Sequence, residues 1–502
     1  MVSKKPRVVI IGAGMAGLTA ANKLYTAVGA SLELVVVEGG SRIGGRISTA
    51  EFSGDRIEQG ATWIHGIDGS PLYKIAGDTN LLISDQPWEC MDGTLEDPLT
   101  VAEGGHLLTP SSVDPISRLF KNLMDFIQCK LETAEQCLVS GDDLSVGSFL
   151  RRGLAAYLEL EKEKNATSVG SWSKRSLQQA VFAMHESIQR TYTSAHDLSS
   201  LDYNAEKDYV LFPGDEITVA GGYSGIINHL ASALPAGVIQ LDRKVEKIEW
   251  ALSGCEGRPV VLHFSDETTM SADHVIVTVS LGVLKAGTSE GSNMFQPPLP
   301  SCKAGAISRL GYGVVNKVFL QLNPNYRGDD GFPFLQMVFH PSDSELRNPK
   351  IPQWIRRTSF LCPIYNNSRV VLSWFTGQEA LELEKLTDDE IIGGFSRTIS
   401  NLLPSKHHNE ISQKFNKVLR TQWGSSPLFL GSYSYVAAGS SIDDMDTLAE
   451  PLPKYGGVDL APLPPLQILF AGEATHKTHY STTHGAYFSG LREANRLLKH
   501  YN

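Results

Sequence analysis

Short apolar runs separated by turn residues dominate the first part of the chain. Residues 7–11 and 32–38 are rich in valine, isoleucine and leucine, which predicts two buried strands, and residues 16–25 between them have the spacing of a helix. Strand, helix and strand in this order predict a βαβ unit. Further short apolar strands are expected at residues 238–241, 245–250, 260–264, 274–279 and 466–470.

Helical spacing marks two stretches between these strands. Apolar residues recur on one helix face between Ile116 and Ile127, and again between Leu383 and Ile399 with an acidic break. The pattern predicts a composite α/β (α+β) fold, in which a Rossmann-like nucleotide-binding domain is interleaved with a substrate-binding domain of mixed sheet and helices. The first domain is expected to comprise residues 1–90, 210–300 and 455–502, and the second residues 91–209 and 301–454. A ligand cleft is expected between them.

A glycine motif occupies the turn between the first strand and its helix. In this GxGxxG the first glycine permits a tight turn, the second lets the backbone approach a pyrophosphate, and the third lets helix and strand pack closely. The helix N-terminus presents its positive end to the phosphates. Glu38 ends the next strand, where an acid can accept hydrogen bonds from a ribose. Contacts to a dinucleotide, NAD or FAD, are therefore expected from Gly12, Gly14, Met15, Ala16 and Gly17.

The segment that begins at Glu38 distinguishes FAD from NAD as the expected cofactor. Residues 38–46 read EGGSRIGGR, whose glycines suggest a second wrap of backbone around the pyrophosphate, and Arg46 can neutralise the phosphate charge. This segment resembles the signature of the FAD-dependent amine oxidase superfamily. The resemblance implies FAD as the cofactor, with contacts from Gly39, Arg42, Gly45 and Arg46.

Later segments resemble the same family in the same order along the chain. Residues 60–66 are similar to a segment that lies along the flavin ring, and residues 470–475 to a C-terminal motif whose glutamate contacts FAD. Residues 480–482 contain no cysteine, which relatives with a covalent flavin carry there, so FAD is expected to be bound non-covalently. The resemblance implies further FAD contacts from Gly60, Ala61, Thr62, Trp63, Val245, Trp423, Gly472, Glu473, Thr482 and Thr483.

Several positions resemble those of polyamine oxidases in particular. Lys317 matches a lysine that contacts the flavin through a water, and it could assist oxygen chemistry or imine hydrolysis. His65 stands where polyamine oxidases hold an amine nitrogen, and Tyr433 matches an aromatic wall that attracts amines by cation–π contact. Thr482 replaces the opposite aromatic wall, which leaves this cage half open. Asp197 either grips a distal ammonium or caps a helix, and the sequence leaves both roles open.

The resemblance implies flavin-dependent oxidation of polyamines. It is strongest to a cytosolic group of plant oxidases that act on thermospermine and spermine. In such a reaction a hydride leaves the carbon beside a neutral amine, the imine is hydrolysed to an aminoaldehyde and a shorter polyamine such as spermidine, and oxygen is reduced to hydrogen peroxide. An amine oxidase that resembles lysine demethylases and a catalytically inactive flavin-binding scaffold are the alternatives.

Composition and charge argue against several classes of partner. The net charge of −11 argues against nucleic acid, because neutralising phosphates requires a basic surface. No stretch approaches the ~20 apolar residues of a membrane span. His476, His479 and His484 lack a carboxylate or cysteine partner at metal-ligand spacing, so no metal is expected. The apolar run at residues 8–21 imitates a signal peptide but contains the glycine motif, so a cytoplasmic protein with a polyamine and oxygen as partners is expected.

Overall fold

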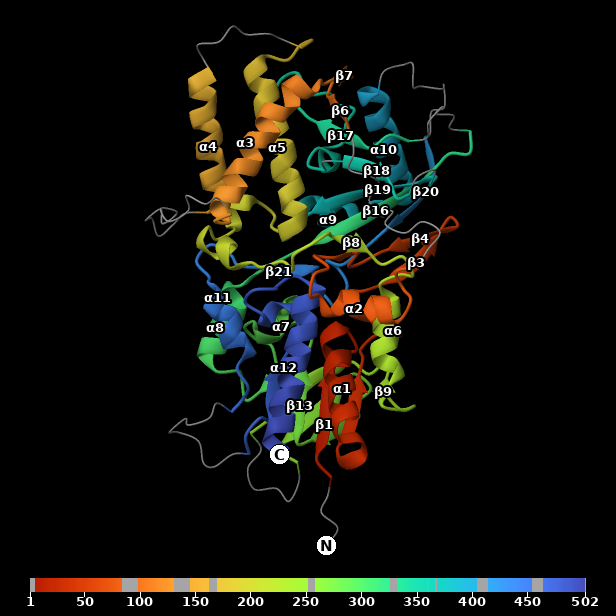
Figure 1. The fold of residues 1–502 in the computed structure, drawn as a ribbon, viewed down its shortest axis with the longest axis vertical. Helices are drawn as coiled ribbons and strands as arrows, with labels where there is room; N and C mark the ends of the chain where they lie inside the picture. The colour runs from red at the N-terminus through yellow and green to blue at the C-terminus, as the bar shows by residue number, and fades with distance from the viewer. Residues whose placement is uncertain are drawn as a thin grey trace.

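The structure is a computed structural model that describes most of the chain. Figure 1 shows an elongated molecule, with a parallel sheet and its helices in the lower half and a second sheet with three long helices in the upper half. The mixed α/β fold class predicted from the sequence is confirmed. The described residues are 5–83, 98–130, 145–161, 169–251, 258–325, 332–358, 360–365, 368–403, 414–453 and 464–501.

The lower half is built on a five-stranded sheet whose neighbouring strands are all parallel. Its strands are nearly continuous apolar runs, as expected for strands covered on both faces. Each lies within a segment predicted from the sequence, and β1 has the predicted bounds. Across the sheet the order is β22 (Ile468–Phe470), β13 (His274–Val277), β1 (Arg7–Ile11), β2 (Glu33–Val37) and β9 (Ile239–Gln240).

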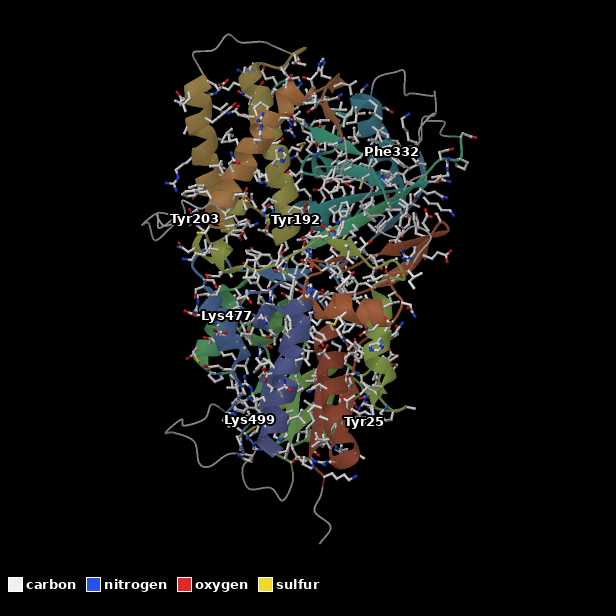
Figure 2. The ribbon with its side chains drawn as sticks, viewed as in Figure 1. Tyr25, Tyr192, Tyr203, Phe332, Lys477 and Lys499 are labelled. Atoms are coloured by element: carbon white, nitrogen blue, oxygen red, sulfur yellow. The ribbon has the colours of Figure 1, made fainter. Side chains whose placement is uncertain are left out.

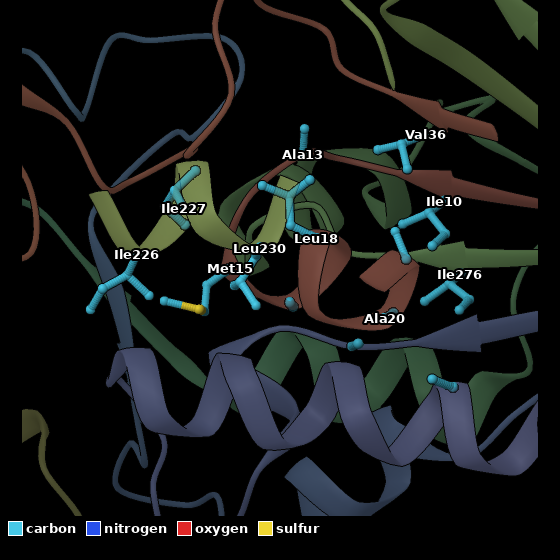
Figure 3. Packing of buried hydrophobic residues seen from close by; sticks show 14 of the residues in the cluster. Ile10, Ala13, Met15, Leu18, Ala20, Val36, Ile226, Ile227, Leu230 and Ile276 are labelled. Carbon is cyan, nitrogen blue, oxygen red and sulfur yellow. The ribbon is translucent and has the colours of Figure 1, made fainter. Parts of the chain in front are cut away.

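Helices cover one face of this sheet. Figure 3 shows Ile10, Val36 and Ile276 of the strands beside Leu18 and Ala20 of the first helix, within one apolar cluster. The first and last helices pack closely, because a Cβ at position 490 would lie 2.3 Å from the carbonyl oxygen of residue 16. The covering helices are α1 (Met15–Val28), α2 (Pro71–Asp78), α6 (Ser224–Ser232) and α12 (Thr483–Tyr501).

The other face carries a four-stranded sheet and short helices. A second apolar cluster joins Val9 and Val275 of the parallel sheet to Ile248 and Leu262 of this smaller sheet. The strand order is β12 (Thr269–Ala272), β11 (Val260–Phe264), β10 (Val245–Glu249) and β14 (Phe295–Gln296). The nearby helices are α7 (Leu281–Thr288), α8 (Ser301–Arg309) and α11 (Ile442–Ala449).

The upper half contains a seven-stranded sheet, antiparallel except between β17 and β6. Figure 1 shows three long helices on one side of it and α10 on the other. The strand order is β20 (Phe415–Arg420), β16 (Val315–Leu322), β19 (Val370–Thr376), β18 (Phe360–Pro363), β17 (Leu335–Val338), β6 (Leu99–Ala102) and β7 (His106–Leu107).

Side-chain caps start three of the helices described in the upper half. The acidic break predicted between residues 383 and 399 separates two helices, because Thr387 and Glu390 form a capping box that starts the second one. The helices are α3 (Pro110–Ile127), α4 (Val146–Leu160), α5 (Lys174–Thr193), α9 (Gln378–Leu383) and α10 (Asp388–Leu402). Among the described residues, no helix combines the length and apolar character that a membrane span requires.

Short strand pairs lie where the two halves meet (Figure 1). They are β3 (Thr49–Phe52) with β4 (Asp55–Glu58), β5 (Trp63–Ile64) with β8 (Ile217–Thr218), and β15 (Gly311–Gly313) with β21 (Tyr433–Tyr435). Short 3₁₀ helices are η1 (Gly29–Ser31), η4 (Leu198–Ser200), η5 (Asn204–Asp208), η6 (Gln353–Ile355) and η8 (Glu473–Thr475). The predicted domain boundaries near residues 90 and 455 fall outside the described residues, and the two-domain division stays a prediction.

Candidate active site

A cavity of about 750 Å³ is lined by residues from both halves of the molecule. The parallel sheet contributes the turns that follow its strands, and the seven-stranded sheet contributes Lys317, Phe360 and Trp374. The cavity therefore lies at the carboxyl ends of parallel strands, where ligands bind in open α/β sheets. Its volume is within the range of small-molecule and cofactor sites, about 300–1,000 Å³.

The glycine turn after β1 forms one wall. Gly12 adopts φ +108°, and a Cβ there would lie 2.5 Å from the hydroxyl of Thr278. Gly17 packs the helix onto the turn, because its Cβ would lie 1.9 Å from the carbonyl oxygen of Gly12. Gly14 caps α1 without any side-chain hydrogen bond. The positive end of α1 is thus open to the cavity, as an anion site requires.

Glu38 links the glycine turn after β1 to a second glycine segment, residues 39–45. One carboxylate oxygen accepts from the backbone N–H of Ala13 at 2.8 Å, and the other accepts from Gly40 at 2.8 Å. The backbone N–H of Gly44 also donates to the carbonyl of Ala13 at 2.8 Å. Two backbone segments free of bulky side chains therefore lie together, and Gly12, Gly14, Gly39, Gly44 and Gly45 all line the cavity.

Arg46 and Glu473 form an ion pair at the same wall. The guanidinium of Arg46 donates to the carboxylate of Glu473 at 2.9 Å and to the carbonyl of Ser432 at 2.7 Å. The other oxygen of Glu473 accepts from the hydroxyl of Ser434 at 2.5 Å and from the N–H of Ser481 at 2.9 Å. Glu473 is buried, so this pair ties three distant segments together beside the cavity.

Lys317 reaches the cavity from the middle of β16. Its ammonium donates to the carbonyls of Glu58 and Gly60, each at 2.9 Å, and to the hydroxyl of Thr62. The side chain is buried, and its ammonium lies 5.9 Å from the ring centre of Trp374. The lysine therefore connects the seven-stranded sheet to the 58–62 segment.

The other residues implied by the resemblance for the reaction also line the cavity, apart from Asp197. His65 Nδ1 lies 3.1 Å from a carboxylate oxygen of Glu216. The hydroxyl of Tyr433 donates to the carbonyl of Thr191. Thr482 is buried as well, and its hydroxyl accepts from the N–H of Gly485 at 3.1 Å in the first turn of α12.

Asp197 lies outside the cavity lining. Its carboxylate accepts from the N–H of Ser199 at 2.9 Å, caps η4, and pairs with Arg151 at 3.1 Å. Although partial burial acts to raise it, hydrogen bonds from Ser199 and the charge of Arg151 lower the pKa of Asp197 to about 2. In the structure Asp197 therefore has the capping role, which is one of the two roles that the sequence left open.

Two predicted cofactor residues also lie behind the lining. The guanidinium of Arg42 donates to the carbonyls of Gly45 at 2.8 Å and Ile47 at 3.0 Å, so it stabilises the second glycine segment. Gly17 acts through close packing, as predicted from the motif. The lining includes the remaining predicted cofactor residues: Gly12, Gly14, Met15, Ala16, Glu38, Gly39, Gly45, Arg46, Gly60, Ala61, Thr62, Trp63, Val245, Trp423, Gly472, Glu473, Thr482 and Thr483.

The cavity lining also contains residues that no sequence motif predicted. Glu206 is buried on the lining beside Gln128, and burial raises the pKa of its carboxyl to about 7. Tyr209 and Tyr480 line the same cavity, with ring centres 5.0 Å apart. These residues belong to no local motif, and only the fold brings them together.

The histidines near residue 480 form an aromatic cluster. The ring of Phe212 lies 5.2 Å from that of His479 and 4.8 Å from that of His484. His484 Nε2 also lies 2.7 Å from the hydroxyl of Ser70. Within the part of the chain that the structure describes, no three His, Cys, Asp or Glu side chains are grouped so that they could hold a metal ion.

The lining fits FAD. Two glycine segments leave room for a pyrophosphate beside the positive end of α1, and Arg46 lies at the same wall. Glu38 is placed at the end of β2, where a ribose hydroxyl could donate to its carboxylate. Both segments would have to change if bulkier residues replaced Gly12 or Gly44, which have positive φ.

Comparison with known proteins identifies the family. The family model described as flavin containing amine oxidoreductase matches residues 15–498. The chain is 54% identical to probable polyamine oxidase 5 of Arabidopsis thaliana over 100% of this chain and 99% of that protein. It is 44% identical to polyamine oxidase 1 of Oryza sativa subsp. japonica, with 100% and 98% covered, and 33% identical to the human peroxisomal N(1)-acetyl-spermine/spermidine oxidase, with 98% and 95% covered. The chain belongs to the flavin-containing amine oxidoreductases, and its cofactor is FAD.

Proposed function

We propose that this protein oxidises polyamines, with thermospermine and spermine as substrates, and releases spermidine, an aminoaldehyde and hydrogen peroxide. The observation that carries the proposal is the buried carboxyl of Glu206 on the cavity wall beside Tyr209 and Tyr480. A carboxylate next to aromatic faces suits an ammonium group. The relatives named as oxidases of polyamines or of acetylated polyamines support the same substrate class.

Glu206 is suited to a ligand that brings its own positive charge. Burial raises the pKa of this carboxyl to about 7, so it ionises less readily than an exposed glutamate. An ammonium beside it would favour the charged form, and burying that ammonium without a partner would be costly. A distal nitrogen of a polyamine satisfies both groups, whereas a monoamine has no second nitrogen to offer.

Residues at the other lining positions would orient the reacting amine. His65, which pairs with Glu216, is placed to accept a hydrogen bond from an amine N–H when its Nε2 is unprotonated. The ring of Tyr433 forms part of the cavity lining, and its hydroxyl donates to the carbonyl of Thr191. Fixing an amine between these groups lowers the barrier by orientation.

FAD, when bound, accepts the two electrons that leave the C–H bond beside the amine nitrogen. The balanced reaction consumes water and oxygen: the amine carbon becomes an aldehyde, the released nitrogen leaves as a shorter amine, and oxygen is reduced to hydrogen peroxide. Lys317, held by Gly60 and Thr62, is the lining group placed to donate a proton or to orient a water in these steps.

A cytoplasmic location without nucleic acid or membrane partners is part of the proposal. The apolar run at residues 8–21 forms β1 and the start of α1, and Val8, Val9 and Ile10 are buried in the core. Cleaving this run would remove the glycine motif, which supports its retention. The net charge of −11 supports a cationic small molecule over a phosphate backbone. Imaging a fluorescent fusion of the full chain tests the location.

Product analysis tests the proposed reaction. Purified holoprotein is incubated in air with thermospermine, spermine, spermidine, a monoamine and a methylated lysine peptide, and amines and peroxide are quantified by mass spectrometry and a peroxidase assay. The proposal expects spermidine and an equal amount of peroxide from both tetraamines. Demethylation of the peptide without polyamine turnover would instead favour the demethylase-like alternative. If no substrate is turned over, the inactive scaffold is favoured.

A further inference from the structure

The last turn of α5 forms part of the cavity wall. Figure 2 labels Tyr192 at the lower end of this helix, where the two halves of the molecule meet. The helix ends at Thr193, and Ser194 adopts the left-handed conformation with φ 59°. Four residues of this turn line the cavity, namely Gln189, Thr191, Tyr192 and Thr193. The exposed ring of Tyr192 places this turn at the mouth of the cavity.

Arg190 lies within the same turn but points away from the cavity. It is absent from the lining, and only 1% of the residue is exposed. Its Nε donates to the carbonyl of His196 at 2.7 Å, and one Nη donates to the carbonyl of Thr376 at 3.0 Å and to the carboxylate of Glu379 at 2.8 Å. These bonds attach the end of α5 to the end of β19 and the start of α9.

The cavity side of the same turn is attached to β21. The hydroxyl of Tyr433 donates to the carbonyl of Thr191, and the hydroxyl of Ser194 donates to the carbonyl of Tyr433 at 2.9 Å. A Cβ at Gly313 would lie 1.9 Å from the carbonyl oxygen of Ser194, so the strand and the turn are in close contact. The turn is therefore held between the seven-stranded sheet and the strand that carries Tyr433.

We propose that Arg190 is a positioning residue that sets the substrate-facing wall formed by the last turn of α5. The inference rests on the proposed function, because it takes this wall to face the polyamine. Arginine suits the task, since its planar fork can reach acceptors in different directions at once, whereas a lysine is a single flexible point charge. The wall would shift if these bonds were lost, and its contacts with a bound substrate would weaken.

Glu379 extends this support outward. Its second carboxylate oxygen lies 3.7 Å from Arg357, which in turn lies 3.7 Å from Asp197. Asp197 pairs with Arg151 on α4, and Arg151 also pairs with Glu186 of α5 at 3.3 Å. Only the Arg190–Glu379 part of this network is largely buried, so it is the part expected to hold the helix end.

The test compares Arg190→Lys, Arg190→Met and Glu379→Gln with the control Arg151→Met. The control removes an ion pair to the same helix, but one whose arginine is half exposed. Holoprotein is selected by its bound flavin, so that variants that fail to fold are recognised, and kcat and KM are measured with the best polyamine substrate. Backbone hydrogen exchange of the peptide spanning residues 189–196 is measured in parallel, and it requires no substrate.

The proposal expects a separation of KM from kcat. Arg190→Met should raise KM about tenfold with kcat changed by less than about threefold, and Arg190→Lys and Glu379→Gln should lie between it and the unchanged control. Exchange in the 189–196 peptide should be about tenfold faster in Arg190→Met and unchanged in the control. The proposal is overturned if folded Arg190→Met shows unchanged exchange and unchanged KM. It is also overturned if the variant loses kcat and bound flavin equally while KM stays the same. If the unsubstituted protein oxidises no polyamine, the proposed function fails, and the exchange result still decides whether Arg190 holds the turn.

Discussion

The ammonium of Lys317 donates a hydrogen bond to the backbone carbonyl of Gly60 at 2.9 Å. This bond joins β16 of the seven-stranded sheet to the segment that follows β4, across residues far apart in the sequence. Both residues line the cavity, and Thr62 accepts from the same ammonium. A single buried side chain thus combines a structural bond between the halves with a place on the cavity lining.

Replacing Lys317 with methionine should slow turnover while the flavin stays bound. The variant keeps the length of the side chain but removes the group placed to hold a proton or a water, which is expected to lower kcat about 10²-fold. Steady-state oxygen consumption with spermine measures the effect, and flavin absorbance reports cofactor retention. The surface variant Lys247→Met provides the control, because that lysine lies on β10 away from the cavity lining. Full activity in Lys317→Met would contradict the assigned role.

Glu206→Gln should stabilise the substrate-free protein at alkaline pH. The folded-state pKa of Glu206 is raised to about 7 from 4.5, so between these values the folded protein binds a proton that the unfolded chain releases. Stability from this group is complete below pH 4.5 and is lost as the pH rises through 7, by about 3 kcal/mol in total. Tm measured from pH 4 to about pH 8 should show the variant gaining on the unsubstituted protein as the pH rises above 4.5, with the full gain reached above about 7.

The same substitution should weaken polyamine binding. Because the ionised carboxylate is the partner of an ammonium, KM for tetraamines should rise at least about tenfold in Glu206→Gln, and its dependence on pH near 7 should be reduced. A monoamine serves as the control substrate, since it has no distal charge. Equal KM values for the tetraamine in the two proteins would remove Glu206 from the substrate site.

Asp197→Asn should leave polyamine KM within about twofold of its original value. The aspartate caps η4 and pairs with Arg151, so its removal is expected to cost about 1 kcal/mol of stability. Chemical unfolding and steady-state kinetics measure the two effects. A large rise in KM for tetraamines alone would restore the ammonium-binding role and contradict the structural assignment.

Glu473→Gln should loosen the cofactor wall. The variant removes the charge that pairs with Arg46 and accepts from Ser434 and Ser481, which is expected to cost about 2 kcal/mol and to lower FAD affinity. Flavin release on dilution and Tm of the holoprotein measure the loss. Asp446→Asn is the matched control, because its pair with Lys477 is exposed on α11 and should contribute less than about 1 kcal/mol.

The two glycine segments on the cavity lining could be predicted from the sequence because each is contiguous in the chain. The glycine turn lies between β1 and α1, and the 38–46 segment, which begins with Glu38, follows β2. Local patterns therefore describe their geometry. The fold class and the strands of the parallel sheet were predicted for the same reason, since each is a short apolar run between turn residues.

Glu206, Tyr209 and Tyr480 could not be predicted as lining residues because they come from separate segments. They meet only after the chain has folded, and a lone acid within a 3₁₀ helix carries no local signal. The sequence left both a ligand role and a capping role open for Asp197, and only the fold brings the arginine on α4 beside it. Arg190 went unnoticed because an arginine in the last turn of a helix is favoured there by the helix dipole in any protein.

Anaerobic flavin reduction tests the central claim most directly. Purified holoprotein is mixed without oxygen with thermospermine, spermine, spermidine or a monoamine, and the visible flavin absorbance is followed in time. The account predicts rapid bleaching by the tetraamines, slower or no bleaching by the monoamine, and return of the absorbance when oxygen is admitted. If a chemical reductant bleaches the flavin but no polyamine bleaches it, the proposed oxidation of polyamines is contradicted.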